Sequence, residues 1–205
     1  MIDLFLKGGP LMYPLLLCSV VSVAVIVERG LLYLRAGTSR AAVSEVLASA
    51  RDGRPEEALD QSRDLGGAVG LVLAEALENR NLPREDLENH LSLTGSAEIK
   101  GLSRHLHYLE LIGKIAPMLG LSGTVLGLAR TFQTVASATR FADPSLLASG
   151  IWEALITTVA GLFIGIPALI FYHLYDNRVR SLAFEMRTGG EEMVAILEEA
   201  RRGQR

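Results

Sequence analysis

The chain has 205 residues, of which 49% are hydrophobic and 21% are charged, and its formal net charge at pH 7 is −3. The apolar residues are bunched rather than spread along the chain, which argues against a soluble globular domain and favours a membrane protein. The net charge carries little information about partners, and the single cysteine, Cys18, excludes an intrachain disulfide.

Three apolar stretches approach the roughly 20 residues that a helix needs to cross a bilayer. They predict membrane-spanning helices at residues 11–34, 113–138 and 150–175. A cleaved signal peptide is the alternative interpretation of the first stretch. We favour a retained anchor, because no small-x-small cleavage site precedes Glu28 and Arg29.

The region between the first two spans, residues 35–112, has the pattern of soluble helices. Apolar residues recur there at helical spacing, and no stretch alternates with a period of two. Turn signals divide the region into several helices, at residues 52–53, 65–70 and 81–83. The pattern that begins at Arg84 is compatible with one helix that continues without interruption into the second span.

The remaining segments are short or amphipathic. Residues 1–10 precede the first span and close with Gly8-Gly9-Pro10, a turn signal. Residues 139–149 connect the second and third spans and leave no room for a domain. The tail, residues 176–205, is predicted as one amphipathic helix that is interrupted at Gly189-Gly190.

Lysine and arginine residues are distributed unevenly along the chain. The stretch from Arg29 to Lys114 holds eleven of the twenty, and the tail holds six. By the positive-inside rule, this long region and the tail are cytoplasmic, and the N-terminus and the 139–149 connection lie outside. The predicted fold class is therefore an all-α membrane protein, with three transmembrane helices and long helices extending into a cytoplasmic helical bundle.

Small residues recur at helical spacing in the second and third spans. They form one seam on each helix, and each seam contains a Gly-xxx-Gly sequence. Such seams let helix backbones approach closely where lipid supplies no hydrophobic force for association. The seam glycines are Gly120, Gly123 and Gly127 in the second span and Gly161 and Gly165 in the third.

One carboxylate, Glu153, lies near the outer start of the third span. An ionisable side chain inside a span is costly and marks a functional site by default, and Thr157 continues the polar character inward. We therefore interpret Glu153 as a functional residue. The alternative is that it reaches the lipid headgroups or pairs with Arg130 or Arg140.

Other candidates for chemistry are weaker. Thr124 and Thr158 lie on the small-residue seams, where they are equally consistent with hydrogen bonds between helices and with the polar lining of a channel. No catalytic constellation or phosphate-binding loop is present in the sequence, so we do not expect an enzyme. His105 and His107 point away from one another on a helix, and no metal site is predicted.

Two segments resemble the signature segments of the MotA/TolQ/ExbB proton-channel family. They are Ile115-Ala-Pro-Met-Leu-Gly-Leu-Ser-Gly-Thr-Val-Leu-Gly127, and Glu153-Ala-Leu-Ile-Thr-Thr-Val-Ala-Gly-Leu162 together with Ile166-Pro-Ala168. The three spans and the size are most similar to the ExbB and TolQ branch, because a MotA-type subunit is expected to have four spans and a larger cytoplasmic part.

The resemblance implies a motor subunit in the inner membrane of a diderm bacterium, with a periplasmic N-terminus and a cytoplasmic C-terminus. Chains similar to this one form a pentamer around the single spans of a dimeric ExbD- or TolR-like partner, and proton flow drives movement that reaches a TonB- or TolA-like protein. Protons are the driving ion, and membrane lipids surround the spans. No other cofactor and no nucleic-acid partner is expected. The alternatives are a passive membrane scaffold and a small transporter.

The same resemblance assigns roles to individual residues. Thr124 and Thr158 line the central pore, and Glu153 belongs with Thr157 to the proton path. At about 100° per residue, Glu153 and Thr158 differ by about 140°, so Glu153 is also a candidate for a subunit interface. Arg130 stands where the family usually has a neutral residue and is a candidate modulator of Glu153. The small-residue seams are expected to let an inner partner helix turn with little friction.

Overall fold

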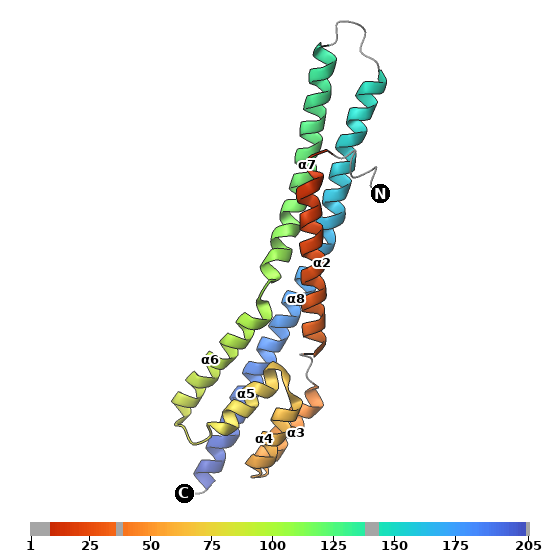
Figure 1. Ribbon diagram of the computed structural model, residues 1–205. Coiled ribbons are helices and arrows are strands. Elements are labelled where there is room, and N and C mark those ends of the chain that lie inside the picture. The colour runs from red at the N-terminus through yellow and green to blue at the C-terminus, as the bar shows by residue number, and fades with distance from the viewer. Residues whose placement is uncertain (1–8, 36–38, 138–143, 204–205) are drawn as a thin grey trace. The chain divides into compact units, whose positions relative to one another are not determined.

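The computed structural model describes residues 9–35, 39–137 and 144–203. Within these ranges the chain is helical and contains no β-strand, which confirms the predicted all-α class. Most of the predicted segment 1–10 lies outside the described residues, and so does Arg140. The helices in Figure 1 are α2 (Met12–Arg35), α3 (Arg40–Arg51), α4 (Pro55–Leu65), α5 (Gly67–Glu78), α6 (Arg84–Ser103), α7 (Leu106–Ser137) and α8 (Pro144–Gly203).

The chain divides into two compact units, each with its own core. The membrane unit comprises Met1–Glu28 and His105–Leu174, and the bundle unit comprises Arg29–Arg104 and Tyr175–Arg205. Helices α2 and α8 each contribute residues to both units.

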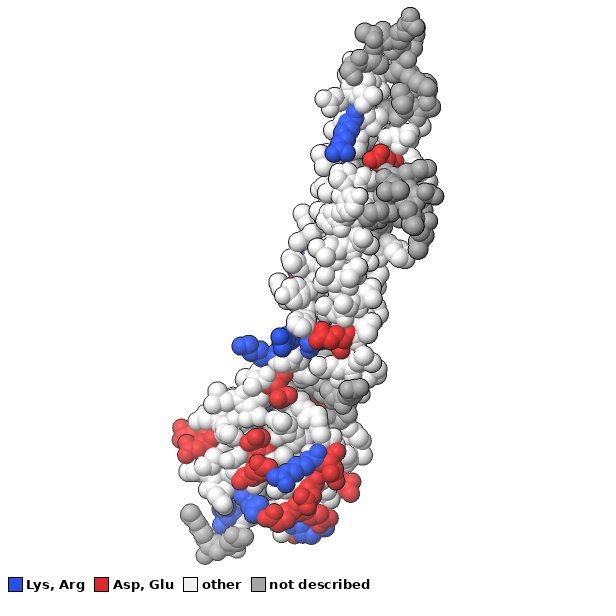
Figure 2. Space-filling view, viewed as in Figure 1, with Lys and Arg blue, Asp and Glu red and all other residues white. Residues whose placement is uncertain are grey.

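Three stretches of the described helices are long and apolar enough to cross a membrane. They are Met12–Leu34, Arg84–Ala136 and Ala148–Gly203. Large apolar side chains on them are widely exposed, such as Val159 at 64% and Phe163 at 80%, which suits lipid or partner helices rather than water. In Figure 2, charged residues gather over the helices of the bundle unit and are few on the membrane unit. The chain is a membrane protein with three candidate spans, as the sequence predicts.

Helices α2, α7 and α8 meet in the core of the membrane unit. Leu15 of α2, Ile112 and Ala116 of α7 and Ala168 of α8 form one buried cluster. Half of these side chains are alanines, and small side chains allow helix backbones to lie close together.

Larger side chains fill the core of the bundle unit, which is built from α3 to α6 and the C-terminal part of α8. Leu73 and Leu77 of α5 are fully buried, as are Leu182 and Met193 of α8. Burial of large apolar side chains away from water is the main source of stability in such a bundle.

The predicted interruption at Gly189-Gly190 is wrong, because α8 runs from Pro144 to Gly203 without a break. A Cβ atom at Gly189 would lie 3.5 Å from Leu73 Cδ2, and one at Gly190 would lie 3.3 Å from Val72 Cγ1. The two glycines therefore allow α5 to pack closely against α8. This packing outweighs their low helix propensity.

The helix that begins at Arg84 does not continue into the second span. Helix α6 ends at Ser103, and His105 has a φ of 68°, a left-handed backbone conformation that is uncommon for a residue other than glycine. In the membrane unit, His105 Nδ1 lies 2.9 Å from Glu28 Oε2. Helix α7 then begins at Leu106.

Contacts with the end of α2 explain why α6 stops there. Arg29 is buried, and its Nη1 donates to the carbonyl oxygens of Gly101 at 3.2 Å and Leu102 at 3.4 Å. The Tyr33 hydroxyl also donates to the Leu102 carbonyl oxygen, at 2.7 Å. The Gly101 carbonyl oxygen also accepts from the Arg104 N–H at 3.3 Å. The bonds from Arg29 and Tyr33 thus add partners for the last carbonyl groups of α6, which lack the usual partners where a helix ends.

Candidate functional site

The glycine seams of α7 and α8 face each other within the membrane unit. A Cβ atom at Gly161 would lie 2.5 Å from the Ala116 carbonyl oxygen, and one at Gly165 would lie 2.6 Å from Pro117 Cδ, so neither position has room for a methyl group. The pairs run in opposite chain directions, as in an antiparallel helix pair: Gly127 with Ala154, Gly123 with Thr157, Gly120 with Thr158 and Gly161, and Gly165 with Gly113 and Pro117.

The seams are therefore an interface within one chain. Each seam glycine is covered by the other helix of the same chain, as the prediction of helix-on-helix packing requires. The expected low-friction surface for an inner partner helix is consequently not formed by these glycines. Any surface that a partner meets must come from other faces of α7 and α8.

Glu153 lies near the start of α8, at one end of this interface, and is half-buried. It lines a small pocket of about 20 Å³. A space of this size accommodates about one water molecule. Three parts of the chain form the other walls: Gly123, Leu126, Gly127 and Arg130 of α7, Ala154 and Thr157 of α8, and Gly9, Pro10 and Leu11 before α2.

Thr157 is almost completely buried, with 1% of its surface exposed. Its hydroxyl donates to the Glu153 carbonyl oxygen at 3.3 Å, and its methyl group contacts Gly123. Because the two residues are one helical turn apart, the side chains of Glu153 and Thr157 reach the same pocket.

Arg130 is exposed and lines the same pocket from α7. Within the described part of the chain, no ion pair joins its guanidinium to the Glu153 carboxylate, although the two opposite charges border one small space. The other pairing considered from sequence, between Glu153 and Arg140, lies outside the described residues.

Thr158 and Thr124 do not line this pocket. The Thr158 hydroxyl donates across the helix pair to the Gly120 carbonyl oxygen at 2.9 Å, and the Thr124 hydroxyl donates to the Leu121 carbonyl oxygen of its own helix at 2.7 Å. The Thr158 bond therefore joins the two helices, whereas the Thr124 bond lies within α7. Each hydroxyl oxygen retains lone pairs that can accept a further hydrogen bond.

The other candidates from sequence do not meet at this site. His105 lies beside Glu28, and the described residues include no group of three or more side chains that could hold a metal ion. Sequence reasoning also missed Gly9 and Pro10 as neighbours of Glu153. The Gly8-Gly9-Pro10 signal predicts a turn, but nothing in it indicates which residue the turn contacts.

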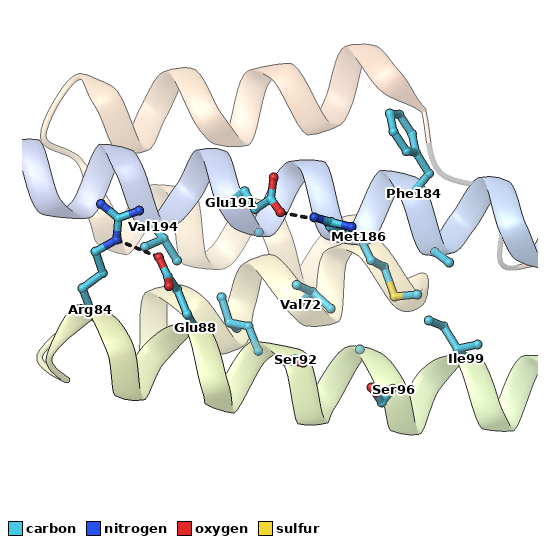
Figure 3. Close-up of a pocket in the computed structure, with 15 residues that line it drawn as sticks. Val72, Arg84, Glu88, Ser92, Ser96, Ile99, Phe184, Met186, Glu191 and Val194 are labelled. Carbon is cyan, nitrogen blue, oxygen red and sulfur yellow. Dashed lines mark hydrogen bonds and ion pairs between the residues drawn. The ribbon is translucent and has the colours of Figure 1, made fainter.

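A larger groove, of about 850 Å³, lies in the bundle unit between α5, α6 and α8 (Figure 3). Val72 belongs to its apolar lining. Charged residues at its edge pair with one another, Arg84 with Glu88 at 2.7 Å and Arg187 with Glu191 at 2.8 Å. None of the site residues predicted from sequence lines this groove, so the Glu153 pocket is the candidate site.

A sequence model of the MotA/TolQ/ExbB proton channel family matches residues 67–188, more than half of the chain. The chain belongs to this family. The matched range contains Glu153, Thr157 and every seam glycine, whereas the Gly9-Pro10-Leu11 turn lies before it. The description of the family names a channel rather than an enzyme.

Individual relatives in the MotA/TolQ/ExbB family agree with this assignment. The chain is 36% identical over 179 residues to the putative biopolymer transport protein ExbB-like 1 of Synechocystis sp., a match that covers 85% of this chain and 70% of the relative. It is 32% identical over 171 residues to the biopolymer transport protein exbB1 of Vibrio cholerae, covering 78% and 72%.

A third relative is the Tol-Pal system protein TolQ of Pseudomonas aeruginosa. The chain is 38% identical to it over 102 residues, which cover 50% of this chain and 44% of TolQ. Together these relatives support the ExbB/TolQ-like branch of the family. With its three apolar helices, the chain is a multi-pass protein of the inner membrane.

Proposed function

We propose that this chain is the channel subunit of a proton-driven motor in the inner membrane. The half-buried carboxylate of Glu153 carries the proposal, because it borders a water-sized pocket together with Thr157 and Arg130 inside an otherwise apolar helix pair. A carboxylate at such a position is costly unless it has a function. Membership of a proton channel family supports the same conclusion.

In this mechanism a Glu153 carboxylate oxygen accepts a proton that arrives from the periplasmic side. The bond from Thr157 to the Glu153 carbonyl oxygen fixes Thr157 beside the carboxylate and keeps the inner wall of the pocket polar. Arg130 places a positive charge at the same wall. Glu153 then passes the proton onward.

The proton then moves to a partner whose single span occupies the centre of the assembly. Five copies of this chain surround a dimeric ExbD- or TolR-like partner, and Thr124 and Thr158 line the pore with hydroxyl oxygens that accept hydrogen bonds. Each charge that crosses about 100 mV releases about 2.3 kcal/mol, which is enough to bias a small rotation. The movement energises a TonB- or TolA-like protein for outer-membrane transport or envelope maintenance.

The orientation proposed for the chain follows from its charges. Eleven of its twenty lysine and arginine residues lie between Arg29 and Lys114, and six follow Tyr175. These charges favour a cytoplasmic bundle unit and C-terminus, and a periplasmic N-terminus. Glu153, near the start of α8, then lies toward the periplasmic side.

Proton flux into vesicles that contain this chain and its single-span partner tests the proposal. Glu153→Gln is expected to abolish the flux, and Thr158→Val to reduce it, while native mass shows that both variants still assemble. Glu191→Gln is the control, because Glu191 is an exposed acid of the bundle unit. Full flux in both channel variants would refute the roles of Glu153 and Thr158. Absent flux in the unmodified chain with its partner would identify a passive scaffold, and solute transport without the partner would identify a transporter.

A further inference from the structure

The Gly9-Pro10-Leu11 turn forms one wall of the Glu153 pocket. Gly9 has a φ of 70°, in the left-handed region, and a Cβ atom at this position would lie 3.0 Å from Glu153 Oε1. Glycine adopts such a backbone conformation at no steric cost and allows this close approach to a carboxylate. Gly9 is therefore suited to its place for two reasons, its backbone conformation and the close approach to Glu153.

Two hydrogen bonds attach the turn to the first helix. The Met12 N–H donates to the Gly9 carbonyl oxygen at 3.2 Å, and the Tyr13 N–H donates to the Pro10 carbonyl oxygen at 3.3 Å. Pro10 restricts its own φ and has no N–H group that would need a partner. The turn is consequently a defined structure at the start of α2, and displacing it breaks bonds that begin this helix.

We propose that this turn controls solvent access to Glu153, with Gly9 as the positioning residue and one water molecule as the ligand of the pocket. The volume of about 20 Å³ suits one water. The Glu153 carboxylate and the Arg130 guanidinium give this water an acceptor and a donor. The positive charge of Arg130 also disfavours a metal cation such as sodium at the same place.

This inference rests on the proposed function for its biological meaning, but its test does not require a working motor. A water-soluble carbodiimide modifies carboxyl groups that it can reach, and mass spectrometry on the full detergent-purified chain gives the rate at Glu153. Gly9→Ala forces a left-handed alanine or displaces the turn. We expect the rate to rise about five- to thirtyfold, which corresponds to the cost of a left-handed alanine.

Gly53→Ala is the matched control. Gly53 has a φ of 75°, and a Cβ atom there would meet nothing within 4 Å, so the variant has the same backbone cost in the bundle unit without touching Glu153. Equal labelling of Glu153 in Gly9→Ala and Gly53→Ala overturns the proposal. Glu153→Gln verifies the labelled site by removing the carboxyl group.

The Pro10→Gly variant and a comparison of salts provide two further tests. Pro10→Gly loosens the turn without adding atoms and is expected to raise the labelling rate by a smaller factor, so the proposal remains testable if Gly9→Ala does not fold. Sodium chloride, compared with choline chloride at equal ionic strength, is expected to leave the rate unchanged. Protection of Glu153 by sodium overturns the assignment of the pocket to one water.

The labelling result and the vesicle result are separable. An absent proton flux in the unmodified chain with its partner, together with a clear contrast between Gly9→Ala and Gly53→Ala, refutes the proposed function and leaves the turn as the barrier over Glu153. A normal flux with no contrast refutes the barrier and leaves the channel.

Discussion

The helices of the membrane unit and the helices of the bundle unit pack through different kinds of contact. In the membrane unit, α7 and α8 approach through positions that lack side chains, such as Gly161 against the Ala116 carbonyl oxygen. In the bundle unit, fully buried large side chains such as Leu73 of α5 and Met193 of α8 fill the core. In water, burial of apolar groups stabilises a fold, whereas in lipid, helices associate through close backbone contact. The same helix, α8, follows both rules along its length.

The space around a glycine differs between the two units. Gly161 has a backbone oxygen at 2.5 Å from any added Cβ atom, whereas Gly189 has its nearest atom at 3.5 Å, an ordinary van der Waals distance. Two glycines of one helix therefore differ in the substitutions that they tolerate.

Gly161→Leu is expected to have the largest effect, a loss of more than about 3 kcal/mol of stability, because the side chain cannot fit between the two backbones. Thermal unfolding in detergent and protease resistance of the α7–α8 pair measure the loss. Gly95→Leu is the control, since a Cβ atom at Gly95 meets nothing within 4 Å. If Gly161→Leu unfolds at the temperature of the Gly95→Leu control, the account of the seam is wrong.

Leu73→Ala tests the opposite rule in the bundle unit. Leu73 is completely buried, and its truncation is expected to cost about 2–5 kcal/mol because it leaves a cavity. Leu71 of the same helix is 40% exposed, and Leu71→Ala is expected to cost less than about 0.5 kcal/mol. Chemical denaturation followed by circular dichroism compares the two. Similar losses would show that this core is not tightly packed.

Arg29→Met tests a third kind of contact, a buried charged group that ends a helix. The variant removes the bonds to the Gly101 and Leu102 carbonyl oxygens and is expected to cost about 1.5–3 kcal/mol. Amide hydrogen exchange over residues 101–105 should become faster. Arg187→Met, which removes an exposed ion pair, is the control and should leave this exchange unchanged. Protection equal to that of the unmodified chain would exclude a role for Arg29 at the end of α6.

Thr158→Val is expected to have the smallest effect on stability, about 0.6 kcal/mol, the average for a hydrogen bond between membrane helices. It removes the bond to the Gly120 carbonyl oxygen and keeps the shape of the side chain. Thermal unfolding in detergent measures the change. A loss of several kcal/mol would assign Thr158 to packing, whereas a small loss together with reduced proton flux would assign it to the channel.

Local patterns in the sequence predicted the spans and the glycine seams, because both depend on spacing within one helix. They also grouped Glu153 with Thr157, which lie one turn apart and line one pocket. Such patterns could not predict features that depend on residues far apart in sequence. The break between α6 and α7 at His105 is an example. Histidine does not itself break helices, and the end of α6 depends on contacts with Arg29 and Tyr33 of α2.

The turn before α2 shows the same limit at the candidate site. Nothing in the spacing of residues relates Gly9 to Glu153, because the two are far apart in sequence and the turn has no periodicity that would indicate its neighbour. The interruption predicted at Gly189-Gly190 failed for a related reason. Propensity alone favours a break there, and the side chains of α5 that hold the helix together are known only from the fold.

The contact between facing seams has an evolutionary consequence. A methyl group gained at one position of the α7–α8 pair is expected to be matched by volume lost at the position that faces it, since the two helices lie in close contact there. Aligned sequences of the family should therefore show covariation between Gly123 and Thr157 and between Gly127 and Ala154. They should show the same between Pro117 and Gly165, where a proline ring in one helix requires a glycine in the other.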